Sequence, residues 1–227
     1  MEKKRQIAAV LILLALIGVI AYRHSTGKDL EKYEASFFDV FDTQTQIIGY
    51  ASSKEQFSEQ MSLIKDKFQY YNDLYDIYHD YEGMNNIKTI NDNAGIQPVK
   101  VDEEIIELLK LGITMDEKTD GNMNIAMGSV LSIWHDYREA GSEDPYSAEL
   151  PPMDELERAA EHTDIHDIVI DEEASTVYLT DPDMSLDVGS IGKGYAVQKV
   201  AEYAKNELGI QYMLFSVGGN VCAIGGH

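Results

Sequence analysis

Residues 184–195 read Met-Ser-Leu-Asp-Val-Gly-Ser-Ile-Gly-Lys-Gly-Tyr, and the rest of the chain is organised around this stretch. Its first five residues predict a short apolar strand, which glycines separate from a long amphipathic helix. Glycine lacks a Cβ atom, so a ligand can approach the backbone of such a turn closely. The helix start adds unpaired amides and a positive dipole end, and Lys193 adds a full charge. The turn therefore suits a diphosphate, with Asp187 placed to hold a hydroxyl, a base or a metal-bound water.

The glycine pattern differs from the two common nucleotide-binding loops. Lys193 is followed by Gly194 instead of Ser or Thr, which excludes a Walker A loop, and the order G-x-x-G-x-G is not that of a Rossmann turn. Taken alone, the stretch fits a phosphate site or a simple tight turn. The helix, predicted over 191–208 and ended by Gly209, leads to a strand over 211–220 with a second glycine pair. That spacing is typical of neighbouring parallel strands.

Together, two segments resemble one protein family. The run Leu186-Asp-Val-Gly-Ser-Ile-Gly-Lys-Gly-Tyr-Ala-Val197, followed by Ser216-Val-Gly-Gly-Asn220, is similar to the ApbE family, the FAD:protein FMN transferases. The resemblance implies an α+β, T-fold-like domain of twisted, mostly antiparallel sheets with packed helices. It also implies an enzyme that uses Mg²⁺ to transfer FMN from FAD to a threonine of an exported flavoprotein, with release of AMP. The acceptor is then expected to be a subunit of a membrane redox complex.

The resemblance also implies roles for individual residues. Asp187 and Lys193 contact FAD, and the backbone carbonyl of Ser190 binds the metal ion. The residues that shape the flavin pocket are Phe41, Tyr78, Asn122, Met123 and Asn124. No side chain is assigned as a catalytic base.

Two of these motifs depart from the family pattern. Phe41-Asp42-Thr43 replaces a Met-Gly-Thr motif, so an aromatic ring would stand where a thioether contacts the flavin. Residues 122–124, Asn-Met-Asn, stand where Ala, Phe and Asp are more common. Asn124 keeps hydrogen-bonding capacity but brings no charge. The alternative explanation for Phe41 is packing in the core.

Residues 1–28 are distinct from the remainder of the chain. Lys3, Lys4 and Arg5 precede an uncharged run over 7–22. This arrangement predicts a secretory signal peptide or a membrane anchor, with a single domain over 29–227 on the extracytoplasmic face of the cell membrane. ApbE-like proteins usually continue well beyond the position of His227. The C-terminal part of the domain, including an acidic metal-binding segment, is therefore expected to be missing.

The charge balance excludes one class of partner. Residues 1–28 hold five of the 18 Lys and Arg residues and one of the 40 Asp and Glu residues, which leaves residues 29–227 with a net charge near −26. Such a charge repels nucleic acid. It is explained either by a solvated surface or by attraction of divalent cations. The single cysteine, Cys222, excludes an intramolecular disulfide, and its apolar surroundings predict burial.

Hydrophobic periodicity predicts the remaining elements. Trp134 is expected in the core, on an apolar helix that follows the 120–128 segment. His162 and His166 are four residues apart, but the helical pattern breaks between them, so a zinc site is not expected. The other predicted elements are a strand over 37–51, helices over 54–78, 102–119 and 153–162, loops over 83–95 and 140–152, and a hairpin of 168–170 with 176–180.

Two alternatives to the transferase stay open. In the first, the domain is an FAD-binding module without transferase activity, because its substituted motifs or its missing part leave the metal site incomplete. In the second, it is an exported protein that binds another nucleotide.

Overall fold

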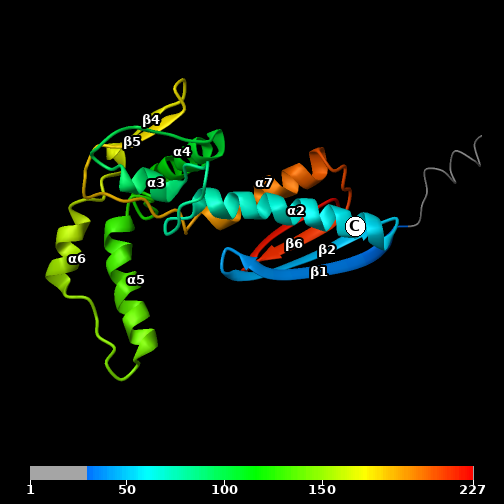
Figure 1. The fold of residues 1–227 in the computed structure, drawn as a ribbon, viewed down its shortest axis with the longest axis horizontal. Coiled ribbons are helices and arrows are strands. Elements are labelled where there is room, and N and C mark those ends of the chain that lie inside the picture. The colour runs from blue at the N-terminus through cyan, green and yellow to red at the C-terminus, as the bar shows by residue number, and fades with distance from the viewer. Residues whose placement is uncertain (1–29, 227) are drawn as a thin grey trace, which may run out of the picture.

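A four-stranded antiparallel sheet forms one end of the molecule. The computed structural model describes residues 30–226, and in it the strands run in the order β1 (Glu31–Val40), β2 (Thr43–Ala51), β6 (Met213–Val217) and β7 (Asn220–Ile224). Helices α2 (Lys54–Tyr75) and α7 (Gly192–Asn206) cover one face of this sheet (Figure 1). Between the sheet and the helices lie fully buried side chains of the core, among them Ile47, Phe68, Val200 and Phe215.

The predicted single strand over 37–51 is wrong, because the chain reverses direction within it. Phe41 and Asp42 have positive φ angles of 54° and 48°, and they form the two-residue turn between β1 and β2. Turns with two positive φ angles match the right-handed twist of paired strands. Neither residue is glycine, so the sequence carries no hairpin signal here. The amide of Phe41 donates a 2.7 Å hydrogen bond to Oδ1 of Asn72 on α2, which holds the turn against the helix.

Helix α2 begins where the pattern predicts and ends earlier. Ser53 caps its first turn by accepting a hydrogen bond from the amide of Gln56. The helix ends at Tyr75, and Asp76 follows in an extended conformation. Tyr78, which the periodicity places on the helix, therefore lies in the loop that follows it. The spacing of apolar residues at threes and fours continues to Tyr78 although the helix has ended. Periodicity alone therefore overestimates the length of the helix.

A second, three-stranded antiparallel sheet lies at the other end of α2. Helix α4 (Glu103–Lys118) matches its prediction, with Asp102 as its N-cap residue. The hairpin of β4 (Ile168–Asp171) and β5 (Thr176–Leu179) is also confirmed. The predicted loop over 83–95 instead contains a short helix with a capping box at Asn86. The elements of this part are α3 (Ile87–Asp92), β3 (Val99–Lys100), α4 (Glu103–Lys118), β4 (Ile168–Asp171) and β5 (Thr176–Leu179), with the strand order β3-β5-β4.

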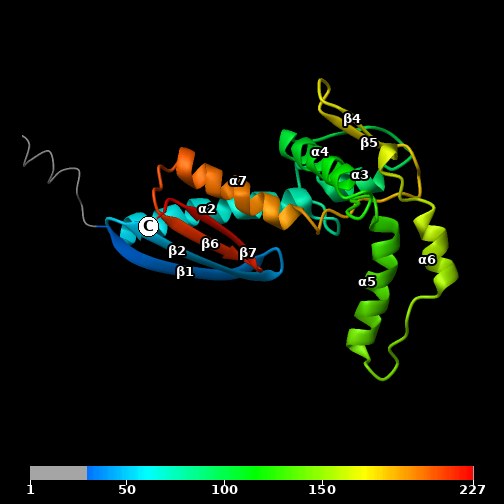
Figure 2. The ribbon, with the colours of Figure 1, turned by 180° about the vertical axis from the view of Figure 1, so that it is seen from behind.

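Helices α5 (Gly128–Glu143) and α6 (Met153–Ala160) pack against each other and project from the body as an arm (Figures 1 and 2). A short 3₁₀ helix, η1 (Ile165–Asp167), follows α6. Helix α5 buries only Gly128 and Val130, and Trp134 is 43% exposed. The prediction of Trp134 as a core residue is therefore wrong, because this part of α5 extends past the core. The predicted loop over 140–152 begins only after Glu143.

The prediction of a strand over 184–188 is wrong: Met184, Leu186 and Val188 are buried, but the segment pairs with no neighbouring strand. The side chain of Asn91, on α3, takes the place of one. Its Oδ1 accepts a 2.7 Å hydrogen bond from the amide of Leu186, and its Nδ2 donates a 3.0 Å bond to the Leu186 carbonyl. The amide of Asp187 donates to the carbonyl of Ile125. The parallel pairing suggested by sequence spacing is thus wrong, since β6 pairs antiparallel with β2 and β7.

The α+β class and the antiparallel sheets are confirmed. Cys222, predicted to be buried, is half-buried on the edge strand β7. Within residues 30–226, no helix has both the length and the apolar character that crossing a bilayer requires. The predicted signal peptide or anchor over 1–28 lies outside the described residues.

Candidate functional site

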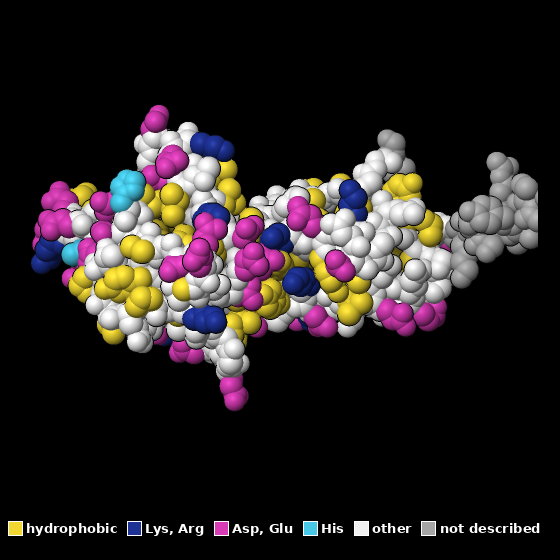
Figure 3. Space-filling view, turned by 90° about the horizontal axis from the view of Figure 1, so that it is seen from above, with side chains coloured by type: hydrophobic (Ala, Val, Ile, Leu, Met, Phe, Trp, Pro, Cys, Tyr) yellow, Lys and Arg dark blue, Asp and Glu magenta, His cyan; other side chains and the backbone are white. Residues whose placement is uncertain are grey.

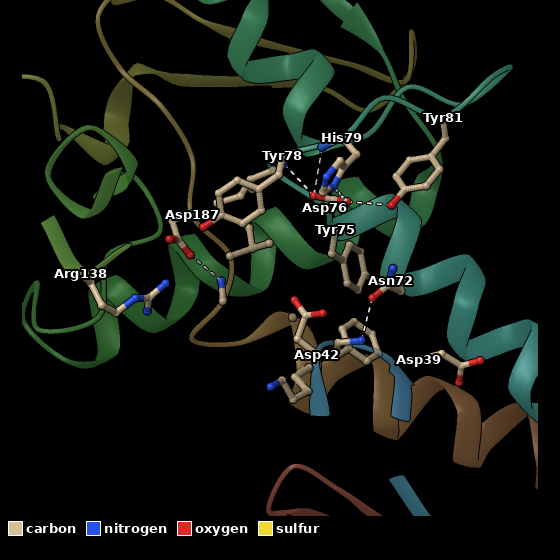
Figure 4. A pocket seen from close by; sticks show the side chains of 16 residues that line it. Asp39, Asp42, Asn72, Tyr75, Asp76, Tyr78, His79, Tyr81, Arg138 and Asp187 are labelled. Carbon is tan, nitrogen blue, oxygen red and sulfur yellow. Dashed lines mark hydrogen bonds and ion pairs between the residues drawn. The ribbon is translucent and has the colours of Figure 1, made fainter. Parts of the chain in front are cut away.

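A cleft of about 570 Å³ opens between three parts of the chain: the β1–β2 turn, the loop that follows α2, and the turn that leads into α7. Figure 4 shows the side chains of these segments converging from opposite walls. The lining residues are Asp39, Phe41, Asp42, Asn72, Tyr75, Asp76, Ile77, Tyr78, His79, Tyr81, Arg138, Asp187, Val188, Gly189, Gly192 and Lys193.

Four of the residues that the family resemblance assigns to FAD line this cleft. They are Phe41, Tyr78, Asp187 and Lys193. The β1–β2 turn supplies the first of them, the loop after α2 the second, and the segment before α7 and its first turn the other two. The fold therefore brings residues that are up to 152 positions apart into one site. Their predicted contacts with a flavin nucleotide stay predictions.

The turn before α7 is held by its own hydrogen bonds, and the first residues of the helix line the cleft. The carbonyl of Val188 accepts hydrogen bonds from the amides of Ile191 and Gly192, which tightens the turn. Oδ1 of Asp187 accepts a 2.8 Å hydrogen bond from the amide of Gly189. No side chain caps the first turn of α7. Unpaired amides at a helix start carry partial positive charge, so this end of the helix suits an anion.

Lys193 lies in this first turn and is half-buried, although the sequence predicts an exposed side chain. Its ammonium group has no hydrogen-bond or ion-pair partner anywhere in residues 30–226, whereas Lys199, on the same helix, is paired with Glu104 at 3.0 Å. A cation that is half-buried and unpaired has lost part of its hydration without compensation. An anionic ligand in the cleft would provide that compensation.

Asp76 holds the loop that carries Tyr78. Its carboxylate accepts hydrogen bonds from the amide of Tyr78 at 2.6 Å and from the hydroxyl of Tyr81 at 2.7 Å, and it pairs with Nδ1 of His79 at 2.9 Å. Burial alone would raise the pKa of Asp76, but these hydrogen bonds outweigh it and lower the pKa below its ordinary value. Sequence reasoning missed Asp76. The signal that could have found it is an Asp directly after a helix that ends early.

The lowered pKa predicts a pH dependence. A carboxylate with a depressed folded-state pKa contributes stability above its unfolded pKa of about 3.9, and the contribution is lost as the pH falls through the folded value. We expect Asp76→Ala to lower the free energy of unfolding at pH 7 by about 1–3 kcal/mol, and by less at pH 2.5. Urea denaturation at the two pH values measures this. Asp80→Ala, in the same exposed loop, is the control, and equal losses for both variants would contradict the role of Asp76.

Tyr78 stands at the mouth of the cleft against a second set of side chains from α5. Its ring lies 5.1 Å from the ring of His135, with a 30° angle between the planes. Arg138 donates from Nη2 to Nδ1 of His135 at 2.8 Å, and His135 Nε2 lies 3.1 Å from Glu139. Because guanidinium only donates, Nδ1 is the acceptor and Nε2 carries the proton. Burial first, and then the negative charge of Asp187, raises the pKa of Tyr78, so its hydroxyl stays protonated.

The lining of the cleft is mainly acidic. Of its charged side chains, Lys193 and Arg138 are basic, and the carboxylates are those of Asp39, Asp42, Asp76 and Asp187. Acidic side chains are also spread along the face seen from above in Figure 3, with basic ones between them. A diphosphate can bind in such a cleft next to the side chains of Lys193 and Arg138, or where a divalent metal ion bridges the diphosphate to a carboxylate. Arg138, exposed on α5, is a second residue that sequence reasoning missed.

The other predicted site residues do not line the cleft. Asn122 and Met123 are tied to Thr119 at the end of α4, through the Asn122 side chain and the Met123 amide. Asn124 donates to the carbonyl of Thr163 at 2.8 Å and accepts from the amide of Ala126 at 2.7 Å, so its side chain fixes the loop between α4 and α5. The predicted flavin contacts of these residues stay predictions.

Ser190 is exposed in the turn before α7, next to the cleft but outside its lining. The Mg²⁺ ion that the resemblance implies prefers oxygen ligands, and the nearby wall offers the carboxylates of Asp42 and Asp187. The donor chemistry therefore fits a hard cation. The predicted ligand role of the Ser190 carbonyl stays a prediction.

One cluster of metal-binding residue types lies away from the cleft. The ligand atoms of His162, Asp181 and Asp183 lie within 4.8 Å of one another. His166, which the sequence spacing offers as a partner of His162, is not a member of it. Nδ1 of His162 pairs with Asp181 at 2.8 Å, and this hydrogen bond raises the pKa of His162 and lowers that of Asp181. The cluster is thus accounted for by an ion pair.

Comparison with known proteins places this chain in a family. The ApbE family profile matches residues 41–227. An FAD:protein FMN transferase of Klebsiella pneumoniae is 25% identical over 186 residues, which are 82% of this chain and 56% of that protein. One from Treponema pallidum is 28% identical over 144 residues, 61% of this chain and 38% of that protein. This chain therefore spans about half the length of the curated relatives it matches.

Solved structures agree with this placement. The crystal structure of the ApbE protein from Thermotoga maritima superposes with a TM-score of 0.71 at 25% identity and covers 87% of this chain and 60% of its own. The flavin transferase ApbE from Vibrio cholerae has a TM-score of 0.70 at 19% identity, and the match covers 85% of this chain and 59% of that protein. At this identity the match shows only that the two proteins share a fold. The fold is that of the ApbE proteins. The chain belongs to the ApbE family.

Proposed function

We propose that this chain forms the FAD-binding part of an enzyme that transfers FMN from FAD to a threonine hydroxyl of an exported flavoprotein. One observation carries the proposal. Lys193, a half-buried cation without a partner among the described residues, lies at the uncapped start of α7 in the cleft that also gathers Phe41, Tyr78 and Asp187. A cation at a helix start and aromatic rings in one cleft are what a diphosphate joined to a flavin requires.

The chemistry proposed is phosphoryl transfer. The threonine oxygen attacks the phosphorus of the FMN half of FAD, a new P–O bond forms, the anhydride P–O bond breaks, AMP leaves, and the hydroxyl proton is released. Negative charge builds up on the diphosphate during this step, and groups that neutralise it lower the barrier. A bound Mg²⁺ ion would supply part of that neutralisation.

Residues of the chain would position the substrate for this step. Lys193 and the amides at the start of α7 would bind the diphosphate, while Phe41 and Tyr78 would contact the isoalloxazine rings through stacking. Asp187, already tied to the amide of Gly189, would keep one carboxylate oxygen directed to a hydroxyl or to the metal ion. Asp76 would hold the Tyr78 loop in place.

The activity is tested by labelling. The protein is incubated with FAD, Mg²⁺ and the exported flavoproteins of its own source, and flavin fluorescence is read after denaturing electrophoresis. A fluorescent band that depends on FAD and Mg²⁺ is expected. FAD binding without any covalently labelled protein would instead favour a flavin-binding module, and no FAD binding at all would favour a protein for another nucleotide.

Arg138 is expected to contribute a second, weaker charge to FAD binding. Arg138→Ala should lower the affinity for FAD about three- to tenfold, because an exposed guanidinium is screened by water and salt. The loss should shrink at high ionic strength. Arg158→Ala, which removes an exposed arginine paired with Asp154 on α6, is the matched control. Calorimetric titration decides, and identical affinities for the two variants would remove Arg138 from the site.

We also propose that the domain lies on the extracytoplasmic face of the cell membrane, held by or released from the segment over 1–28. The basic residues before the uncharged run support this topology. Protease added to intact cells is expected to digest residues 29–227. Full protection of the domain, while a known surface protein is digested, would contradict the proposal.

A further inference from the structure

Arg138, the exposed arginine that lines the cleft, is held by a neighbour on its own helix. Its Nη2 atom donates a 2.8 Å hydrogen bond to Nδ1 of His135, which lies one turn earlier on α5. That bond exists only while His135 is neutral, because a protonated Nδ1 has no lone pair with which to accept it. The protonation state of His135 therefore decides whether Arg138 is tied to the ring.

The surroundings of His135 offer other partners to a protonated ring. The side chain is 24% exposed, and its ring lies against that of Tyr78, with 5.1 Å between the centroids. The hydroxyl of Tyr78 lies 3.4 Å from the same Nδ1 atom, and Nε2 lies 3.1 Å from a carboxylate oxygen of Glu139. A protonated ring donates from both nitrogens, so it can bond to these two groups while it repels the guanidinium beside it.

The charged and titratable groups around His135 come from four segments of the chain. The carboxylates among them attract a protonated ring, and Arg138 repels it. Arg138 and Asp187 also line the cleft, where Figure 4 shows them at the same side, so a guanidinium that leaves His135 stays at the cleft. The groups are Tyr78 from the loop after α2, Arg138 and Glu139 from α5, and two residues that line the same hollow as His135: Glu149 from the segment between α5 and α6, and Asp187 from the segment before α7.

We propose that His135 is a positioning residue whose protonation releases Arg138 to bind the diphosphate. The inference rests on the proposed binding of FAD in the cleft. While His135 is neutral, Arg138 has to give up its bond to Nδ1 before it can pair with a phosphate oxygen. When His135 is protonated, that bond is already lost and repulsion directs the guanidinium away from the ring. FAD therefore binds more tightly at lower pH, in the range where histidine side chains change their charge and the diphosphate does not.

Calorimetric titration with FAD in the presence of Mg²⁺, at about pH 5.5 and about pH 8, measures the effect. The unchanged protein is expected to bind FAD about threefold more tightly at the lower pH, because one exposed charge-assisted contact is gained. Arg138→Ala is expected to bind FAD equally at the two pH values, since no guanidinium is left to release. Equal affinities in the unchanged protein, or a pH dependence that persists in Arg138→Ala, would overturn the inference.

Two substitutions of His135 separate release of Arg138 from packing. His135→Gln keeps an acceptor at every pH, so Arg138 stays held, whereas His135→Phe keeps a ring against Tyr78 but offers no acceptor. At about pH 8 the Phe variant is expected to bind FAD about threefold more tightly than the unchanged protein, and the Gln variant about equally. Neither variant should respond to pH. If both bind FAD less tightly than the unchanged protein, the ring only supports the packing of α5 and the inference is wrong.

His79 is a second histidine near the bound nucleotide, because it lines the cleft itself. His79→Gln is expected to keep the difference between the two pH values, whatever it does to the affinity. His166→Gln, which changes an exposed histidine on η1, is the matched control and is expected to leave both affinities unchanged. Loss of the pH difference in His79→Gln would assign the effect to His79 instead of His135.

Nitrogen NMR of the imidazole ring tests the contact without FAD. The ring of His135 is expected to take up its proton at a higher pH in Arg138→Ala than in the unchanged protein, because the neighbouring cation is gone. Identical titrations of the ring in the two proteins would overturn the inference. Failure of the proposed function shows differently, as absence of FAD binding in the unchanged protein at both pH values.

Discussion

Lys193→Ala is expected to reduce the affinity of this protein for FAD by roughly tenfold or more. A charge-assisted hydrogen bond contributes about 1.5–3 kcal/mol, and 1.4 kcal/mol corresponds to a factor of ten in affinity. The loss should appear at the diphosphate, so FAD and ADP should both bind less well while riboflavin, which has no phosphate, should be unaffected. The fold should be kept, because the ammonium group has no partner within residues 30–226 to lose.

The matched control is Lys54→Ala. Lys54 is an exposed lysine at the start of α2, away from the cleft, and like Lys193 it lies in the first turn of a helix. Both variants and the unchanged protein are titrated calorimetrically with FAD in the presence of Mg²⁺. If the two variants bind FAD with the same affinity, the diphosphate does not lie at the start of α7.

Asn91→Ala is expected to lower the free energy of unfolding by about 2–4 kcal/mol. The change removes both hydrogen bonds that the Asn91 side chain makes to Leu186, and it leaves the backbone amide and carbonyl of that buried residue without partners. Because the segment over 184–188 positions the turn before α7, FAD affinity should fall as well. Urea denaturation followed by circular dichroism measures the loss of stability.

Asn85→Ala provides the comparison. Asn85 is exposed, and its side chain makes one hydrogen bond, to the carbonyl of Lys100 at 2.8 Å. The expected loss of stability is about 1 kcal/mol or less. If the two asparagine variants lose similar amounts of unfolding free energy, contacts other than those of Asn91 hold the segment over 184–188 in place.

The sequence predicts best those elements whose local pattern agrees with their packing. Helix α4 follows its apolar stripe and begins after an Asp cap, and the β4–β5 hairpin follows its alternation. The β1–β2 turn was missed because Phe41 and Asp42 adopt positive φ angles without the glycine or asparagine that usually signals them. Asn91 was missed for a different reason: its partner, Leu186, is 95 residues away, and no local pattern encodes such a contact.

The same distinction applies to the site. Lys193 and Asp187 belong to one short motif with an evident chemical purpose, and the structure places both on the cleft. Asp76 holds the Tyr78 loop through residues two to five positions after it, a role that depends on the helix ending at Tyr75. Arg138 reaches the cleft through tertiary geometry alone, from α5. Trp134 was misjudged because a tryptophan in an apolar helix usually packs inside, and here α5 leaves the body.

The central claim is that the cleft at the start of α7 binds FAD through its diphosphate. Calorimetric titration of the unchanged protein with FAD, ADP and riboflavin, each in the presence of Mg²⁺, tests it most directly. The account predicts one bound FAD per chain, weaker binding of ADP because it lacks the flavin contacts of Phe41 and Tyr78, and riboflavin binding at least about tenfold weaker than FAD. Riboflavin binding as tight as FAD, or no binding of FAD, would contradict it.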